Sequence, residues 1–245
     1  MRLIRSVSAG LIDLVLPPRT WDGAEPAQIE GLSAAMWGRI AFIEAPLCDG
    51  CGSPFEHELG DGLRCPACQA RPRAWDRARA ASVYGEGSRE LILQLKHADR
   101  TDLARTLSGW IARAAAELVE EADAVVPVPM HWRRLLRRRY NQAAELARPL
   151  AARFRRPYRP GLLQRKKADS QAGRSASGRR RAVQGAFVAP ERQRRHIEGR
   201  RILLIDDVMT TGSTAEACAR ALKRAGAAAV DVAVVAKVTQ SAIAI

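Results

Sequence analysis

The residues best suited to chemistry follow one short apolar segment in the last quarter of the chain. Residues 202–205 are all apolar, and two carboxylates, Asp206 and Asp207, come directly after them. The loop that follows is rich in hydroxyl groups and consists of Val208, Met209, Thr210, Thr211, Gly212, Ser213 and Thr214. From residue 215 to residue 225, apolar side chains recur at helical spacing. The pattern predicts a buried strand, a tight loop and a helix.

This loop has the chemistry of a phosphate-binding site. Its hydroxyls can donate to an anion, and Gly212 allows the backbone to turn tightly. The helix behind it adds unpaired N–H groups and the positive end of its dipole. Adjacent carboxylates are costly to hold together, so ribose hydroxyls or Mg2+ would suit Asp206 and Asp207. The loop lacks the lysine of a P-loop and the glycine spacing of a dinucleotide fingerprint. The alternative is a connection rich in threonine only because threonine caps helices well.

The same segment closely resembles the 5-phosphoribosyl-1-pyrophosphate (PRPP) motif of type I phosphoribosyltransferases. In that motif an apolar strand and two acidic residues precede a Thr-Thr-Gly-Ser/Thr loop, as they do here. The resemblance implies that Asp206 and Asp207 are catalytic and hold the ribose hydroxyls while the anomeric carbon becomes cationic. It also implies that residues 208–214 bind PRPP, that residues 210–214 anchor its 5′-phosphate, and that Mg2+ bridges the pyrophosphate and the sugar.

A second candidate anion site follows an earlier strand, expected at residues 123–129 and ending in Pro-Val-Pro. The loop beyond this strand is strongly basic and contains Arg133, Arg134, Arg137, Arg138 and Arg139. Tyr140-Asn141-Gln142 and a helix from Ala143 come next, and this is where an α/β sheet would bind a second anion. In type I phosphoribosyltransferases the corresponding loop holds pyrophosphate, so the resemblance places Arg138, Asn141 and Gln142 there. A solvated arginine face is the alternative for some of these arginines.

A long polar segment without apolar periodicity runs from residue 164 toward Ala186. Inside a compact domain such a segment is usually a lid or a disordered linker. Its position between two strands and ahead of the PRPP-like loop resembles the mobile catalytic loop of the type I fold. The resemblance implies that its closure excludes water from a reactive ribosyl cation and brings Arg or Lys to the leaving pyrophosphate.

Four cysteines form two CxxC pairs, Cys48 with Cys51 and Cys65 with Cys68. Pairs at this spacing match a tetrahedral four-cysteine zinc ribbon, so we expect a structural Zn2+ there. Two disulfides or a redox CxxC are the alternatives. The first suits a secreted protein, and the second needs only one pair followed by a helix. A fifth cysteine, Cys218, lies on the apolar face of its helix and is expected in the core.

The first 16 residues have an ambiguous pattern. Two arginines precede an apolar stretch, as in a signal peptide, but Asp13 interrupts that stretch. Pro17-Pro18-Arg19 follows in place of a small-residue cleavage site. Apolar residues at positions 4, 7, 11 and 14 fall on one face of a helix instead. We therefore expect a short docking helix in a cytoplasmic protein.

Residues 17–45 lack clear periodicity and are a possible degenerate copy of the cysteine ribbon. Residues 20–23 and residues 33–36 stand at a spacing similar to that of the cysteine pairs, but they contain no metal ligand set. A ribbon of this kind would have to hold together by packing, through Trp21 and Trp37.

Composition says more about the possible binding partners than about the fold. The chain has 245 residues and a formal net charge of +14, mainly from arginine. Such a charge predicts attraction to nucleic acid, anionic membranes or phosphorylated ligands, although a GC-rich genome also enriches arginine. No apolar run approaches the ~20 residues of a membrane span.

The combination of features resembles the ComF family, which is associated with competence and DNA uptake in bacteria. An apolar helix before Pro-Pro-Arg, a four-cysteine ribbon, a Pro-Val-Pro strand end, a Tyr-Asn-Gln loop and the Asp-Asp-Val-Met-Thr-Thr-Gly motif occur in that order. The expected fold is α/β, with a type I phosphoribosyltransferase-like parallel sheet flanked by helices. The expected organisation is a helix and possible degenerate ribbon (1–45), a zinc ribbon (46–75) and a phosphoribosyltransferase domain (78–245).

Two functions from different classes follow from these features. The first is a phosphoribosyltransferase that binds PRPP with Mg2+ and acts on an unidentified acceptor. The second is a non-catalytic protein in which the PRPP fold is kept as a scaffold and the basic loops hold single-stranded DNA, with DNA-uptake or recombination proteins as possible partners. Basic grooves with interleaved aromatics such as Trp132 and Tyr140 suit that role.

Overall fold

The computed structural model describes residues 31–57, 60, 62–97, 102–130, 135, 140–166 and 185–239. Internal contacts divide the chain into one unit that ends at Ala41 and a second that begins at Phe42. In the first unit, Ser33 caps the short helix α2 (Ala34–Gly38) because its hydroxyl accepts a hydrogen bond from the Met36 N–H at 3.1 Å. The predicted docking helix and residues 20–23 of the possible degenerate ribbon lie outside the described residues.

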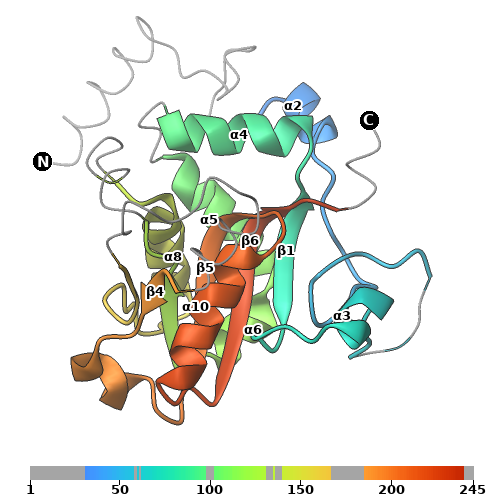
Figure 1. Ribbon diagram of the computed structural model, residues 1–245. Helices are drawn as coiled ribbons and strands as arrows, with labels where there is room; N and C mark the ends of the chain where they lie inside the picture. The colour runs from blue at the N-terminus through green and yellow to red at the C-terminus, as the bar shows by residue number, and fades with distance from the viewer. Residues whose placement is uncertain are drawn as a thin grey trace, which may run out of the picture. The chain divides into compact units, whose positions relative to one another are not determined.

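The second unit is built on a sheet of four parallel strands in the order β1-β6-β5-β2 (Figure 1). These strands are β1 (Ala78–Val83), β2 (Ala124–Pro127), β5 (Arg201–Met209) and β6 (Ala229–Lys237). Every residue of β2 and β6 is buried, as expected for strands of a parallel sheet with both faces covered.

Helices cover both faces of this sheet. Helices α5 (Leu103–Ala114) and α8 (Gln142–Arg153) pack together on one face, and α10 (Ser213–Arg224) packs on the other, which is the near face in Figure 1. The other helices that the structure describes in full in this unit are α3 (Pro66–Ala70), α4 (Glu86–His97), α6 (Ala116–Glu121) and the 3-10 helix η1 (Glu191–His196). The predicted core cysteine, Cys218 of α10, is fully buried between helix and sheet.

The register of the strands brings their carboxyl ends to one edge of the sheet. Pro127 pairs with Ile205, and Asp206 pairs with Val234, so the segments that follow β2 and β5 leave the sheet side by side. The central strand is longer than the apolar run at 202–205 predicts. It continues through both acidic residues because β6 keeps pairing with it as far as Met209.

A short antiparallel pair flanks the predicted lid. Strand β3 (Gln164–Arg165) pairs with β4 (Phe187–Val188), which confirms strands on both sides of the polar segment. Residues 167–184 of the lid lie outside the described residues. Among the residues that are described, no helix is long and apolar enough to cross a membrane.

Candidate functional site

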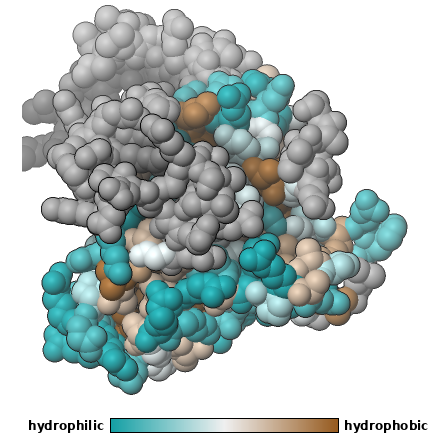
Figure 2. All heavy atoms as spheres, in the orientation of Figure 1, coloured by the Kyte–Doolittle hydropathy of each residue, from teal (hydrophilic) through white to brown (hydrophobic). Residues whose placement is uncertain are grey.

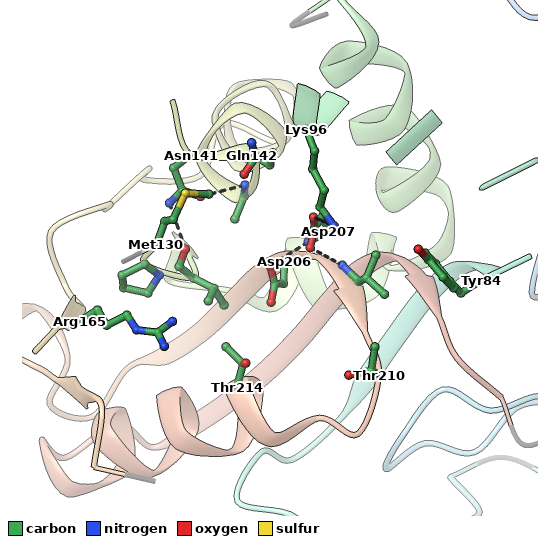
Figure 3. A pocket seen from close by; sticks show the side chains of 14 residues that line it. Tyr84, Lys96, Met130, Asn141, Gln142, Arg165, Asp206, Asp207, Thr210 and Thr214 are labelled. Atoms are coloured by element: carbon green, nitrogen blue, oxygen red, sulfur yellow. Dashed lines mark hydrogen bonds and ion pairs between the residues drawn. The ribbon is translucent and has the colours of Figure 1, made fainter. Parts of the chain in front are cut away.

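The two adjacent carboxylates lie in β5 at the edge where the parallel strands end (Figure 3). Asp207 Oδ2 lies 2.6 Å from the Nζ of Lys96 on α4, which pairs this carboxylate with a cation. Asp206 Oδ1 accepts a hydrogen bond from the Asp207 N–H at 2.9 Å. Asp207 is therefore neutralised by a lysine, whereas Asp206 accepts a hydrogen bond from the backbone.

Asp206 has a strongly perturbed environment. Burial raises its pKa well above the ordinary aspartate value, and the Asp207 carboxylate beside it acts in the same direction. A bound cation or a pair of ligand hydroxyls would favour the ionised form and reverse this effect. A carboxyl with such a shifted pKa in a cleft is typical of a functional site.

The hydroxyl-rich loop connects β5 to α10 on the other side of the cavity. Gly212 has a φ of 76°, a left-handed conformation that favours glycine, and α10 begins at the next residue. Thr211 Oγ1 and Ser213 Oγ lie 2.7 Å apart, and the Ser213 N–H donates to Thr211 Oγ1 at 3.3 Å. The loop and its neighbours enclose a hollow of about 50 Å³. One water molecule needs only ~10–15 Å³, so the hollow has room for a small tetrahedral anion.

The opposite wall is formed by the start of α8. The Asn141 side chain caps this helix, because its Oδ1 accepts from the Ala143 N–H at 3.1 Å. Its Nδ2 donates to the carbonyl of Val128 at 3.0 Å, so Asn141 also fixes the segment that leaves β2. Gln142 is 2% exposed, and its buried Nε2 has no hydrogen-bond partner in the part of the chain that the structure describes. This unsatisfied donor is available to an acceptor in the cavity.

Both walls line one cavity of about 370 Å³. Its lining residues are Tyr84, Lys96, Val128, Pro129, Met130, Asn141, Gln142, Ala143, Arg165, Asp206, Asp207, Val208, Thr210 and Thr214. The structure thus brings together most of the residues singled out for PRPP, although they come from two distant parts of the chain. Arg138 lies outside the described residues. The arrangement can orient a polyol at the carboxylates and phosphate groups at the loop and at Gln142.

Three lining residues, Tyr84, Lys96 and Arg165, have no role in the sequence analysis. Lys96 lies on an amphipathic helix where a lysine needs no explanation, and its partner Asp207 is far away in sequence. Arg165 ends the short strand β3, with its guanidinium 5.3 Å from the centre of the Phe187 ring. A sequence signal exists only for Arg165, since it begins the basic run that leads into the predicted lid.

The four cysteines of the two CxxC pairs form a second candidate site. They carry no disulfide, and their sulfur atoms all lie within 4.8 Å of one another. The Sγ atoms of Cys51 and Cys65 are 3.9 Å apart, close to the ~3.8 Å edge of a tetrahedron with zinc–sulfur bonds of ~2.3 Å. The Cys48 Sγ also accepts the Cys65 N–H at 3.1 Å. These residues could therefore hold a zinc ion.

The thiols are crowded enough to shift one another's ionisation. Burial raises the pKa of Cys68, and the neighbouring Cys51 adds to the effect. Burial also opposes ionisation of Cys51, but Ser53 and the Lys237 ammonium outweigh it and lower the pKa of Cys51 to about 6. A cation at the centre would favour all four thiolates, because metal ligands must be deprotonated.

Comparisons with known proteins define the class of the sheet unit. The phosphoribosyl transferase domain family matches residues 140–245, which contain α8, β5, the hydroxyl-rich loop and β6. Among solved structures, the chain is similar to orotate phosphoribosyltransferase from Aeropyrum pernix, with 18% identity and a TM-score of 0.34 over 63% of this chain and 66% of that chain. The molecule has a type I phosphoribosyltransferase fold with a four-cysteine cluster at residues 48–68, which confirms the predicted fold class.

Full-length relatives identify the family. DNA utilization protein YhgH of Escherichia coli K12 is 33% identical over 214 residues, which cover 82% of this chain and 91% of that protein. Competence protein F of Haemophilus influenzae is 29% identical over 193 residues, which cover 76% of this chain and 82% of that protein. The chain belongs to the family of YhgH and competence protein F, as its resemblance to the ComF family predicted.

Proposed function

We propose that this protein binds PRPP with Mg2+ and transfers its phosphoribosyl group to an acceptor, in the cytoplasm and as part of DNA uptake. The observation that supports this best is the joining of three features in one cavity: a carboxylate pair, a hydroxyl-rich helix start and the unsatisfied Nε2 of Gln142. The relatives' names, DNA utilization protein and competence protein F, support the cellular role. Residues 46–75 then form a zinc ribbon and residues 78–245 the phosphoribosyltransferase domain.

Each side chain has a distinct role in this proposal. Asp206 and Asp207 accept hydrogen bonds from the ribose hydroxyls, and their negative charge stabilises the anomeric carbon as it becomes cationic. Residues 210–214 hold the 5′-phosphate, so that binding energy from this remote group positions the reacting carbon. Gln142 donates to the pyrophosphate. Asp206 and Asp207 offer the oxygen ligands that Mg2+ prefers, and the ion would neutralise the leaving pyrophosphate.

Isothermal titration with Mg2+ and PRPP tests this proposal. The double variant Asp206→Asn, Asp207→Asn keeps the shape of both side chains and removes their charge. We expect a loss of affinity of about 100-fold or more, ~2.7 kcal/mol. Asp123→Asn, at the opposite edge of the sheet, is the matched control and should bind like the wild type. Unchanged affinity in the double variant would exclude the carboxylates from the site.

We infer a second function, the binding of single-stranded DNA, from a basic pocket at the opposite edge of the sheet. This pocket has a volume of about 370 Å³ and is lined by Asp123, Ala124, Arg156, Pro157, Arg159, Arg195, His196 and Arg200. Arg200 pairs with Asp123 at 3.4 Å. In the described part of the chain, Arg156, Arg159 and Arg195 have no carboxylate partner, and the Arg156 Nε is buried without a hydrogen-bond acceptor.

Uncompensated arginines in one pocket favour a phosphate-bearing ligand. Like charges held close together repel one another, and an anion with several oxygens relieves this repulsion. The surface around η1, which supplies Arg195 and His196, is hydrophilic at the lower left of Figure 2. This pocket lies away from the cavity at the carboxyl edge, so DNA and PRPP would bind at the same time.

Salt-dependent DNA binding tests this second function. Arg156→Gln, Arg159→Gln and Arg195→Gln together should weaken the binding of an oligothymidylate and lower its salt slope by ~0.7 per lost phosphate contact. A triple variant of three exposed arginines elsewhere, Arg113, Arg220 and Arg224, makes the same change in net charge. If both triple variants lose affinity equally, the net charge of the protein determines the affinity for DNA and the pocket does not.

A further inference from the structure

Three consecutive carbonyl groups of the turn between the first two cysteines accept hydrogen bonds from the sheet and from the segment just before it. The carbonyl of Asp49 accepts the Ala78 N–H at 3.1 Å, and that of Gly50 accepts the Trp75 indole N–H at 2.7 Å. The carbonyl of Cys51 accepts the Lys237 ammonium at 2.9 Å. The conformation of this turn therefore determines where Trp75, Ala78 and Lys237 lie.

Trp75 connects this turn to the hydroxyl-rich loop. Its side chain is 2% exposed, and its ring lies directly against Gly212. A Cβ at position 212 would lie only 2.7 Å from Cη2 of the indole, closer than atoms can approach. The adjoining residue, Ala74, donates its N–H to Glu216 Oε2 at 3.0 Å, in the first turn of α10. The indole thus holds the loop from outside, at the point where the backbone turns.

Lys237 makes a second, independent connection. It is the last residue of β6 and pairs with Met209, which immediately precedes Thr210. Its ammonium is bound by the Cys51 carbonyl and by the Ser53 hydroxyl, both in the cysteine region. Gly52 lets the turn lie close to the backbone of β1, since a Cβ there would lie 2.8 Å from the carbonyl oxygen of Ala78. The loop is therefore held at both ends by residues that contact the first CxxC turn.

We propose that Trp75 is a positioning residue through which the metal-held cysteine turn sets the conformation of the PRPP loop, so that affinity for PRPP depends on the metal. This inference rests on the proposed binding of PRPP. The buried residues of the cysteine cluster are only Cys48, Cys51 and Cys68, among the described residues, with Phe55 and Cys65 packed against them. So small a cluster does not hold its shape without its metal.

Loss of the metal then acts on the loop by a definite route. The carbonyls at 49–51 lose their fixed arrangement, the indole loses its acceptor, and the backbone at Gly212 samples other conformations. If the loop adopts its binding-competent conformation for only a fraction of the time, its apparent affinity for the ligand is reduced by that fraction. The core of the sheet stays folded, because none of the four clustered cysteines belongs to its apolar cluster.

The test is a cycle of two changes, removal of zinc and substitution of Trp75, with PRPP affinity as the first measurement. We expect Trp75→Ala to weaken Mg2+–PRPP binding by about tenfold with one zinc per chain retained, and Trp75→Phe, which keeps most of the ring, to weaken it less. Removal of zinc with a chelator, followed by dialysis, should weaken the wild type by a similar factor and weaken Trp75→Ala little further. Trp110→Phe, at a buried tryptophan whose ring meets that of Phe42 edge to face, is the control.

Two outcomes would overturn this inference. Trp75→Ala could bind PRPP like the wild type, or zinc removal could weaken both proteins by the same factor, which would mean that Trp75 does not transmit the effect. A second measurement needs no PRPP: hydrogen exchange of the amides at 211–216 should become faster in Trp75→Ala and in the metal-free wild type. If the wild type does not bind PRPP but shows this change, the proposed function fails and the coupling stands. If exchange at 211–216 does not change, the coupling fails.

Discussion

The cysteine cluster and the parallel sheet lie in one unit of the chain but are stabilised by different interactions. The sheet has a continuous apolar core in which Leu204, Val232 and Leu222 are fully buried. The cluster buries little besides its own sulfur atoms. The binding loop therefore lies at the boundary of a region stabilised by burial and a region that depends on a metal. Each region should therefore fail under a different perturbation.

Removal of the metal should have the largest effect, and the effect should be centred on the cysteine region and the adjoining loop at 211–216. A structural zinc ion contributes ~10 kcal/mol or more to the folding of a small domain, so Cys48→Ser or a chelator should unfold residues 46–73 locally. Hydrogen exchange should show loss of protection there and retained protection in β5 and β6. Global unfolding would mean that the two regions are not separable.

A core substitution should destabilise the sheet and leave the cysteine region intact. Leu204→Ala removes a fully buried side chain from the central strand and should lower the free energy of unfolding by ~3 kcal/mol. Urea denaturation followed by circular dichroism measures this change. The zinc content should stay at the wild-type value, and a loss of zinc in this variant would contradict the separation of the two regions.

A substitution at the boundary should have an intermediate effect. Gly212→Ala places a Cβ against the Trp75 ring and forces alanine into a left-handed conformation, for a total cost of ~1–3 kcal/mol. Both thermal stability and PRPP affinity should fall. In a Trp75→Ala background the clash is gone but the backbone strain remains, so Gly212→Ala should cost less stability there than in the wild type. An equal cost in both backgrounds would show that the indole is not the obstacle.

Asp206→Asn should have the smallest effect on stability, and it should raise the free energy of unfolding. The pKa of Asp206 is raised in the folded protein, so ionisation of this carboxyl disfavours the fold. The protonated carboxyl contributes its full stabilisation below about pH 3.8, and this contribution is lost as pH rises through the raised pKa. The variant should therefore be more stable than the wild type by ~1 kcal/mol near neutral pH, and less so toward pH 4. Thermal melts of both proteins at several pH values measure the difference. A gap that widens as pH falls would contradict the raised pKa.

Local patterns in the chain predicted much of the fold and part of the site. The apolar run at 202–205 and the hydroxyl-rich loop indicated a strand and a helix start, and both are present. The spacing of the two CxxC pairs indicated a cluster, and the four sulfur atoms are together. These features depend on neighbouring residues, because a helix start or a CxxC turn is formed by residues a few positions apart.

Other features could not be read locally because they join distant parts of the chain. The length of β5 depends on how far β6 continues beside it, and the pairing of Lys96 with Asp207 depends on where α4 ends. Helices α5 and α6 are separate elements because Ala115 leaves the helical conformation with a φ of −133°. Periodicity alone contains no information about such tertiary contacts.

The amino-acid sequence by itself determined the class of the fold, the two carboxylates, the hydroxyl-rich loop and the four thiols, since each is a pattern of residue types at short spacing. Only the tertiary structure decided that Asp206 has a raised pKa, that Gln142 has an unsatisfied donor, and that Trp75 rests on Gly212. The physical reason is that burial, desolvation and close packing are properties of the space around a residue. That space is filled by segments far away in sequence.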